Sequence, residues 1–420
     1  MTDIRNGNKQ GMTIDKRAVF YLSGFDAGGT ERVTLLNANA LADRGCKIEL
    51  LVCHGNGPLV NQVSTNVQVT CLTAASLWQA RSYAVAADPA GLGKLLRPIL
   101  LPKKPSRTLP YLPALARFLQ RYKPAVLLSA MAPLNVETLL ARRLANVATR
   151  VVISEHSNLS HDITSARPKD WRRRNLAALL HRTYLWANAI VTVSNGVGDD
   201  LAAYAHIPRE RITTIYNPVV TSELFDKARE VPNHPWFKPG APPVVLGVGR
   251  LARQKDFPTL LQAFARLRTK RRARLMILGQ ANNHRTTAER QAELMALAAK
   301  LGITEDIALP GFVHNPYAYM AHAGVFVLSS RFEGLPTVLI EALACGLPVV
   351  STDCPNGPAE ILENGKYGSL VPVGDAAALA EAISAILDAP PDRDQLRTRA
   401  LAFTVDRAVE KYEKILFPIA

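Results

Sequence analysis

Short apolar runs alternate with segments of helical character along the whole of this 420-residue chain. The first half contains five such runs: AVFYLS at 18–23, KIELLVC at 47–53, AVLLS at 125–129, VVIS at 151–154 and AIVTVS at 189–194. Strands that are joined through helices lie parallel, are buried on both faces and have right-handed crossovers. The alternation therefore predicts an α/β fold with doubly wound, Rossmann-like sheets.

The pattern restarts after a Pro-rich passage, VPNHPWFKPGAPP, at residues 231–243. Further apolar runs follow at 244–248, 274–278, 307–309, 325–328 and 347–351. A chain of this length exceeds one ordinary hydrophobic core, so two domains are expected. We predict a first domain over 18–230, a linker over 231–243 and a second domain over 244–395. Residues 392–417 have helical periodicity, and a C-terminal helix is predicted in the region 396–420. The polar segment 1–17 reads as a disordered lead-in without a signal peptide.

Composition narrows the class of protein. The apolar fraction of 48% indicates a folded chain, and no apolar run reaches the roughly 18 to 20 residues that span a bilayer. The cysteines number five, an odd count without close metal-ligand spacing: Cys46, Cys53, Cys71, Cys345 and Cys354. These cysteines favour a reduced, cytoplasmic compartment over a disulfide framework.

The net charge of +15 is concentrated in the first half of the chain. No acidic residue occurs between Pro89 and Val136, where Lys103, Lys104 and Arg107 accompany several leucines. Basic residues interleaved with leucines suit docking on an anionic membrane surface. A solvated basic face above core leucines is the alternative. Nucleic acid would also be attracted, but no nucleic-acid motif or aromatic stacking platform accompanies the charge, so no nucleic-acid partner is expected.

The segment RFEGLPTVLIEALACGLPVV, at 331–350, combines two acids with a helix start. Pro336 suits a first helical turn and Gly346 a helix stop, which predicts a helix over 336–345. Its N-terminus leaves unpaired N–H groups where an anion can bind. Glu333 and Glu341 beside that site would repel a phosphate unless they accept hydrogen bonds from hydroxyl groups. A polyhydroxylated phosphate ester such as a sugar nucleotide is therefore the predicted ligand.

Two other segments add phosphate-binding features. Gly28 and Gly29 follow the first apolar run, so their backbone can approach a diphosphate closely. Arg250 and Lys255 follow the run at 244–248. Two cations there would neutralise the diphosphate and stabilise the negative charge that develops on it when it leaves. The D-x-D motif at 392–394 lies far from these segments in sequence and reads as acidic charge at a helix N-terminus, so no metal is expected.

The segment from Glu333 to Glu341 resembles the E-x7-E element of retaining glycosyltransferases of family 4. Four further segments resemble the same family: SGFDAGGTERV at 23–33, SEHSN at 154–158, GVGRLARQKDFPTLLQAF at 247–264 and CPNGPAEIL at 354–362. The resemblance covers most of the chain from about Val19 to Leu370, and the combination is far more specific than any one segment.

The resemblance implies a GT-B fold: two facing Rossmann-like domains, an interdomain cleft and a C-terminal helix that returns to the first, acceptor-binding domain. It implies transfer of a hexose or N-acetylhexosamine, with retention of configuration, from a nucleotide sugar in cell-surface glycan biosynthesis. UDP is the family's usual carrier, and the acceptor would be lipid-linked or a saccharide. The nucleotide sugar would be a co-substrate, and no cofactor is implied. Together with the basic segment between Pro89 and Val136, this predicts a cytoplasmic protein that binds peripherally to the inner face of the cell membrane.

The resemblance also implies roles for individual residues. Glu341 would bind the ribose hydroxyls, Glu333 the hydroxyls of the transferred sugar, and His156 that sugar near its reacting carbon. The implied catalytic set is Glu333, His156, Arg250 and Lys255. Backbone contacts to diphosphate and sugar would come from Gly334, Leu335, Pro336 and Thr337, and the base would lie against Gly311 and Phe312. Adjacent loops hold His314, Asn217 and Ser194, and Glu155 could orient His156 or reach the acceptor.

Two alternatives remain at this point. A GT-B epimerase or phosphorylase would use the same donor site, although the E-x7-E element with its Arg and Lys spacing speaks against both. A non-enzymatic membrane-binding module is the other, and it would bind anionic vesicles without any turnover.

Overall fold

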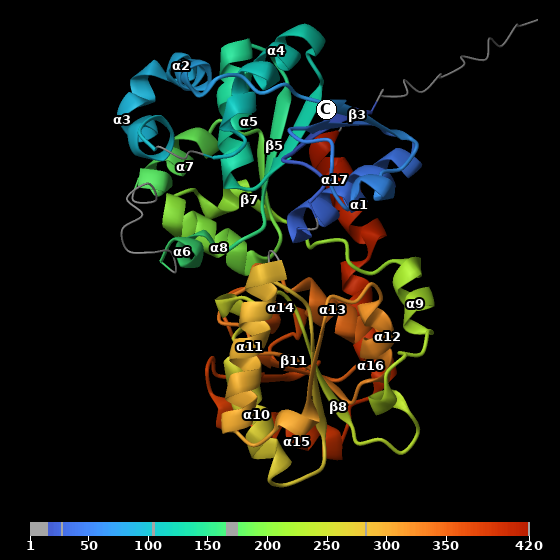
Figure 1. Ribbon diagram of the computed structural model, residues 1–420. Coiled ribbons are helices and arrows are strands. Elements are labelled where there is room, and N and C mark those ends of the chain that lie inside the picture. Colours follow the sequence, from blue (N-terminus) through green and yellow to red (C-terminus); the bar gives the residue numbers. More distant parts are fainter. Residues whose placement is uncertain (1–15, 27, 103–105, 165–174, 282–283, 419–420) are drawn as a thin grey trace, which may run out of the picture.

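A computed structural model describes residues 16–26, 28–102, 106–164, 175–281 and 284–418 and shows two α/β domains (Figure 1). Within these ranges, every strand pairing in both sheets is parallel. The doubly wound α/β fold that the alternating sequence pattern predicts is therefore confirmed. Most of the predicted lead-in, residues 1–15, lies outside the described ranges, and β1 begins at Arg17.

The first domain holds a seven-stranded sheet of order β3-β2-β1-β4-β5-β6-β7. Its strands are β1 (Arg17–Leu22), β2 (Lys47–Val52), β3 (Val67–Cys71), β4 (Val126–Ala130), β5 (Arg150–Glu155), β6 (Ala189–Thr192) and β7 (Ile212–Thr214). Its helices are α1 (Gly29–Asp43), α2 (Leu77–Ala87), α3 (Leu92–Leu95), α4 (Leu112–Tyr122), α5 (Ala132–Ala145), α6 (Leu159–Thr164), α7 (Leu176–Tyr184) and α8 (Asn195–Ala205). Short turns are η1 (Val60–Gln62), η2 (Pro89–Gly91), η3 (Leu96–Leu100), η4 (Leu109–Tyr111) and η6 (Arg209–Arg211).

Alternate residues of these strands build two cores, one on each face of the sheet. Tyr21 and Leu127 pack with α2, α4, α5 and α7 on one face. Phe20 and Leu128 pack with α1 and with a helix from the far end of the chain on the other. Burial on both faces explains why the strands read as continuous apolar runs.

The second domain holds a six-stranded sheet of order β10-β9-β8-β11-β12-β13. Its strands are β8 (Val244–Val248), β9 (Arg274–Leu278), β10 (Ile307–Gly311), β11 (Val325–Leu328), β12 (Val349–Thr352) and β13 (Ser369–Val371). Its helices are α9 (Ser222–Ala228), α10 (Phe257–Arg268), α11 (His284–Lys300), α12 (Pro316–His322), α13 (Thr337–Ala344), α14 (Pro358–Ile361), α15 (Ala376–Asp388) and α16 (Arg393–Ala400). Short turns are η7 (Pro235–Phe237), η8 (Arg253–Lys255), η9 (Thr304–Asp306) and η10 (Leu401–Phe403).

The chain crosses between the domains earlier than the Pro-rich passage suggests. Val219 and Val220 donate backbone hydrogen bonds to the carbonyl oxygen of Phe403, over 3.0 and 3.1 Å, and Val220 forms an isolated parallel bridge with Thr404. Helix α9 already packs on α12, and Phe237 of the predicted linker stacks edge-on against Tyr319. Residues 231–243 therefore lie on the second domain, because their aromatic side chains pack there.

The predicted C-terminal helix is two helices, α16 and α17 (Val405–Leu416), separated by η10. Asp392 caps α16 by accepting a hydrogen bond from Asp394 N at 2.9 Å, as its D-x-D motif suggests. Helix α16 packs on α13, whereas α17 packs on α1 and β5. The return to the first domain therefore begins at Thr404 rather than at residue 396, and α17 buries Val409, Tyr412 and Leu416 there.

Candidate active site

Glu333 lies in the loop between β11 and α13, and its carboxylate is held by three donors. Its Oε1 accepts from Ser330 Oγ at 2.6 Å and from Lys255 Nζ at 2.7 Å, while its Oε2 accepts from Gln254 Nε2 at 3.3 Å. Its backbone N–H donates to Pro355 O at 3.1 Å. The side chain is only 7% exposed, so the carboxylate is fixed in place before any ligand arrives.

Helix α13 is the predicted helix, and it spans Thr337–Ala344 with Pro336 as the N-cap and Cys345 as the C-cap. No side chain caps its N-terminus, so the first-turn N–H groups face the loop that carries Glu333. Gly346 has φ +70°, the left-handed conformation that ends a helix. The local sequence signals therefore located both the helix and its free N-terminus.

Glu341 lies in the second turn of α13 and is 9% exposed. Burial raises its pKa above the ordinary value, while Arg32, Tyr317 and Lys255 oppose that rise. Arg32 comes from the first turn of α1 in the other domain, so the two domains face each other at this helix. Sequence reasoning missed Arg32, although it lies in the GGTER segment. It also missed Tyr317, which has no local signal.

The turn at Gly28 and Gly29 precedes α1. A Cβ atom on Gly28 would lie 2.1 Å from Glu31 Oε2, and Ser23 Oγ donates to Glu31 Oε1 at 3.1 Å. Gly29, in contrast, has no heavy atom within 4 Å of its would-be Cβ. The open backbone that an anion needs is therefore at Gly29, whereas the space beside Gly28 holds a carboxylate.

Arg250 and Lys255 lie in the β8–α10 loop. Gly249 has φ +157°, and a Cβ there would lie 3.0 Å from Lys255 Cε, so the lysine stem crosses the glycine. Arg250 is exposed, and within the part of the chain that the structure describes it forms no ion pair. Lys255 thus pairs with Glu333, whereas Arg250 lies at the exposed surface of the same loop.

His156 directly follows β5 and is partly buried. Its Nε2 lies 3.0 Å from Ser154 Oγ, and burial lowers its pKa to about 4, so the ring is neutral at pH 7. A Cβ on Gly334 would lie 2.3 Å from His156 O, and Ser194 Oγ donates to Gly334 O at 2.9 Å. The structure therefore brings the His156 strand and the Glu333 loop together, although they belong to different domains.

Glu155 does not face an acceptor. Its side chain is 1% exposed, and its Oε1 accepts hydrogen bonds from Asn135 Nδ2 at 2.8 Å and from Tyr184 OH. Asn135 also donates to Ser154 O at 2.9 Å. The expectation that Glu155 could reach the acceptor is wrong, because this buried network fixes it beneath the end of β5.

The remaining predicted residues lie around this centre. Gly311 ends β10 with φ +83°, and Phe312 is 58% exposed with its ring edge-on to His314 at 5.2 Å. Asn217 is 7% exposed. Lys103 and Lys104 lie outside the described residues, and Arg107 is exposed.

Comparison with known proteins shows the family and the fold of this chain. Models of the group 1 glycosyl transferases and of glycosyltransferase family 4 match residues 230–402 and 27–223. The Campylobacter jejuni N-acetylgalactosamine-N,N'-diacetylbacillosaminyl-diphospho-undecaprenol 4-alpha-N-acetylgalactosaminyltransferase is 32% identical over 274 residues, 64% of this chain and 70% of its own length.

A second C. jejuni enzyme is an alpha-1,4-N-acetyl-D-galactosaminyltransferase named for a diphospho-undecaprenol-linked glycan. It is 26% identical over 94% of this chain and 97% of its own length. The crystal structure of Anabaena HepE with UDP and glucose superposes with a TM-score of 0.70 at 19% identity, covering 96% of this chain and 99% of that one. The chain therefore belongs to the glycosyltransferases of group 1 and family 4 and has their GT-B fold.

Proposed function

We propose that this glycosyltransferase moves a hexose or N-acetylhexosamine from a UDP-linked donor to a lipid-linked or saccharide acceptor. The observation that carries the proposal is the pairing of Glu333 with Lys255 directly beside the His156 strand. A fixed carboxylate binds sugar hydroxyls, and a neighbouring cation binds a diphosphate. The acceptor class and UDP rest on the relatives, whose names specify undecaprenol-linked glycans, and on HepE, which holds UDP and glucose.

Each part of the donor has a matching group. Glu341 would accept hydrogen bonds from the ribose, and Arg250, Lys255 and the free N-terminus of α13 would bind the diphosphate. The exposed Phe312 ring would stack on the base. The transferred sugar would then lie between Glu333 and His156.

Transfer is proposed to proceed with retention and without a metal. The bond between the anomeric carbon and the phosphate oxygen breaks, and the nucleoside diphosphate leaves with the electron pair. The acceptor hydroxyl oxygen bonds to the anomeric carbon from the same face, and its proton passes to the departing phosphate oxygen. Arg250, Lys255 and the dipole of α13 would stabilise the charge that develops on the leaving group.

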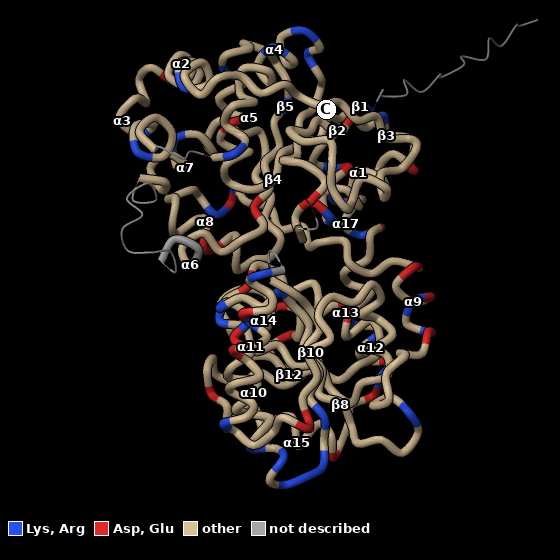
Figure 2. The backbone as a smooth tube through the Cα atoms, in the orientation of Figure 1, with Lys and Arg blue, Asp and Glu red and all other residues tan. Residues whose placement is uncertain are grey.

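A membrane surface is proposed on the first domain. Four exposed apolar side chains lie on α2, α3, η3 and the loop after η3: Trp78 at 79%, Leu92 at 43%, Leu96 at 38% and Leu101 at 57%. Lys94, Arg97 and Arg107 are exposed among them, and Figure 2 shows basic positions along α3. Apolar side chains enter a lipid interface while cations attract anionic headgroups.

Not every leucine of this segment belongs to that surface. Leu95, Leu109 and Ile99 are buried in the domain core. These three side chains therefore fit the alternative in which the apolar residues of the segment belong to the core. Among the described residues, no helix combines the length and apolar character that a bilayer-spanning segment needs. We therefore propose peripheral binding to the inner face of the cell membrane, through the exposed subset alone.

A donor screen tests the function. UDP-, GDP- and ADP-linked sugars are incubated with a polyprenyl-diphosphate-linked glycan, nucleotide release is measured, and the anomeric configuration of the product is read by NMR. We expect UDP-dependent transfer with retention. Conversion of the donor without an acceptor would identify an epimerase, and turnover that depends on orthophosphate would identify a phosphorylase. Binding to vesicles without any turnover would identify a membrane-binding module.

A further inference from the structure

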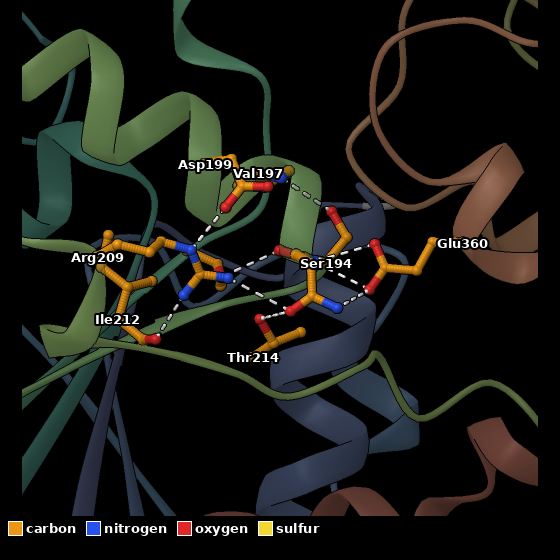
Figure 3. Close-up of polar contacts among 9 residues, drawn as sticks. Ser194, Val197, Asp199, Arg209, Ile212, Thr214 and Glu360 are labelled. Atoms are coloured by element: carbon orange, nitrogen blue, oxygen red, sulfur yellow. Dashed lines mark hydrogen bonds and ion pairs between the residues drawn. The ribbon is translucent and has the colours of Figure 1, made fainter.

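Glu360 of α14 reaches from the second domain to the first turn of α8 (Figure 3). Its two carboxylate oxygens each lie 3.0 Å from the backbone nitrogen of Asn195. Its Oε1 also accepts from Asn195 Nδ2 at 2.7 Å and from Tyr216 OH at 2.7 Å. A carboxylate at a helix N-terminus is favoured by the helix dipole, so this contact is a charge-assisted clamp between domains.

The side chain of Asn195 is oriented for that clamp. Its Oδ1 accepts from Thr214 Oγ1 at 2.8 Å and from Arg209 Nη2 at 3.4 Å, and Arg209 is itself held by Asp199 Oδ1 at 2.6 Å. Since both oxygen partners are donors, the amide NH2 must point towards Glu360. The first domain therefore presents a preformed pair of N–H donors to this carboxylate.

The clamp adjoins the loop that carries Glu333. Ser194, the N-cap of α8, accepts from Val197 N at 3.1 Å and donates to Gly334 O at 2.9 Å. A Cβ on Gly357 would lie 2.5 Å from Pro336 Cδ, so the segment before Glu360 backs directly onto the Glu333 loop. The N-terminus of α8 thus contacts both the loop that carries Glu333 and the side chain of Glu360.

Glu360 is anchored within its own domain, and Arg399 donates to the carbonyl oxygens of Glu360 and Ile361 at 2.8 and 2.7 Å. Beside the clamp, Gly196 and residues of the 353–360 segment line a cavity of about 330 Å³. At its edge the two domains touch, because a Cβ on Gly196 would lie 2.4 Å from Asn356 Oδ1. The domains are therefore joined at this place by polar contacts to a rigidly held helix, with open space next to them.

We propose that Glu360 is a positioning residue for glycosyl transfer. It fixes the second domain against α8, so that Glu333 from one domain and His156 from the other flank the same donor sugar. The inference rests on the function proposed above. Glu341, Arg250 and Phe312, which are assigned to the nucleotide, lie in the second domain, and the Gly29 turn is the first domain's one assigned contact to the diphosphate. Loosening the clamp should therefore slow the chemical step far more than it weakens nucleotide binding.

The test compares Glu360→Ala, Glu360→Gln, Asn195→Ala and the Glu360→Ala/Asn195→Ala double variant with wild type. Glu363→Gln is the matched control, because Glu363 pairs with Lys366 and Arg399 inside the second domain. We expect kcat to fall about ten- to hundredfold in Glu360→Ala, the cost of a small misplacement of reacting groups. The UDP affinity measured by calorimetry and the donor KM should change by less than about twofold.

Each single alanine variant should lose as much kcat as the double variant, because all three variants remove the same contact between Glu360 and Asn195. Glu360→Gln should recover part of the loss, since its amide oxygen can still accept from Asn195. A kcat equal to that of Glu363→Gln would overturn the proposal. The proposal would also be overturned if Glu360→Ala lowered the melting temperature while the folded enzyme kept a normal kcat. A loss of UDP affinity as large as the loss of kcat would overturn it as well.

A second measurement does not depend on turnover. Cys71 is the exposed cysteine of this chain, and Lys270→Cys adds a label site on the second domain. The distance distribution between labels at these positions should broaden in Glu360→Ala and stay narrow in Glu363→Gln. An unchanged distribution would overturn the clamp even if the wild type transferred sugar. A broadened one would uphold the clamp even if no tested donor were turned over and the proposed function failed.

Discussion

Lys255 Nζ lies 2.7 Å from Glu333 Oε1 although the two residues are 78 positions apart in the chain. Their side chains are 15% and 8% exposed, so the pair is largely shielded from solvent. The same ammonium also acts on the buried Glu341. One lysine therefore acts on both acids of the E-x7-E element.

Replacement of either loop cation should impair catalysis. We expect Lys255→Ala and Arg250→Ala each to lower kcat/KM about 10²-fold or more, the usual loss for one charge-stabilising group. Lys255→Ala should also lower the melting temperature, because it leaves the Glu333 carboxylate buried without its cation. Arg250→Ala should not, because Arg250 is exposed. Steady-state kinetics and thermal unfolding measure both effects.

Arg253→Ala is the matched control for that pair, since Arg253 is an exposed cation of the same loop. It should leave kcat/KM unchanged. Near-normal turnover in both Lys255→Ala and Arg250→Ala would remove these residues from the donor site.

Chelation should have little effect on the reaction. In the proposed mechanism, Arg250, Lys255 and the N-terminus of α13 stabilise the charge that develops on the leaving diphosphate. We therefore expect donor turnover in EDTA to equal turnover without it. Loss of activity that Mg²⁺ or Mn²⁺ restores would show that this account of the leaving group is wrong.

Binding to anionic vesicles should depend on the basic segment of the first domain. We expect replacement of Lys103, Lys104 and Arg107 with Glu to release the protein from vesicles and to slow transfer to a lipid-linked acceptor, while donor hydrolysis in water persists. Wild-type binding should weaken between about 0.05 and 0.5 M salt, because screening shortens the reach of exposed charges. Trp78→Ala should also weaken binding to vesicles, but the binding that remains should keep the salt dependence of the wild type.

The charge-matched control replaces three exposed cations of the second domain with Glu: Lys270, Arg272 and Lys300. This variant should float with vesicles as the wild type does. Equal flotation of the wild type and the Lys103/Lys104/Arg107 variant would leave the segment as a solvated basic face.

Stability should fall with rising pH through Glu137 of α5. This carboxyl is 2% exposed, accepts from Thr108 Oγ1 at 2.9 Å, and has its pKa raised by burial from 4.5 to about 8. Between those values the folded chain keeps a proton that the unfolded chain releases. The free energy of unfolding should therefore decrease by up to about 1.4 kcal/mol per pH unit over that window.

Glu137→Gln should flatten this dependence, because the amide does not ionise. Denaturant unfolding at several pH values measures the slope, and Glu381→Gln, on an exposed face of α15, should leave it unchanged. An identical slope in wild type and Glu137→Gln would assign the pH dependence to other groups.

Local signals explain which parts of the site could be predicted. Pro336 and Gly346 set the ends of α13 through their own backbone preferences, so the helix and its free N-terminus were readable from the sequence. The Glu333–Lys255 pair was not, because it depends on how two distant loops meet above the second sheet. Glu155 was misread for the same reason, since its partners Asn135 and Tyr184 come from α5 and α7.

The domain crossing shows a different limit. Proline and glycine mark 231–243 as irregular, and irregular backbone suits a linker as well as it suits a packed loop. Trp236 decides between them, because Arg274 lies 5.2 Å from its ring centroid and holds the segment on the second domain. The true crossing at Val219 and Val220 reads as ordinary apolar sequence, since both side chains are buried in the second domain's core.

The side-by-side crossings at Val220 and Thr404 make the second domain a single uninterrupted insertion within the first. The ribosome therefore makes the first domain's strands early but delivers Val409, Tyr412 and Leu416 only after the whole second domain. The second domain, complete before α17 emerges, can fold as a unit while the first still has an uncovered apolar face beside α1. Although the first domain's strands are made earlier, the core on their α1 face can thus be completed only after the second domain has been made.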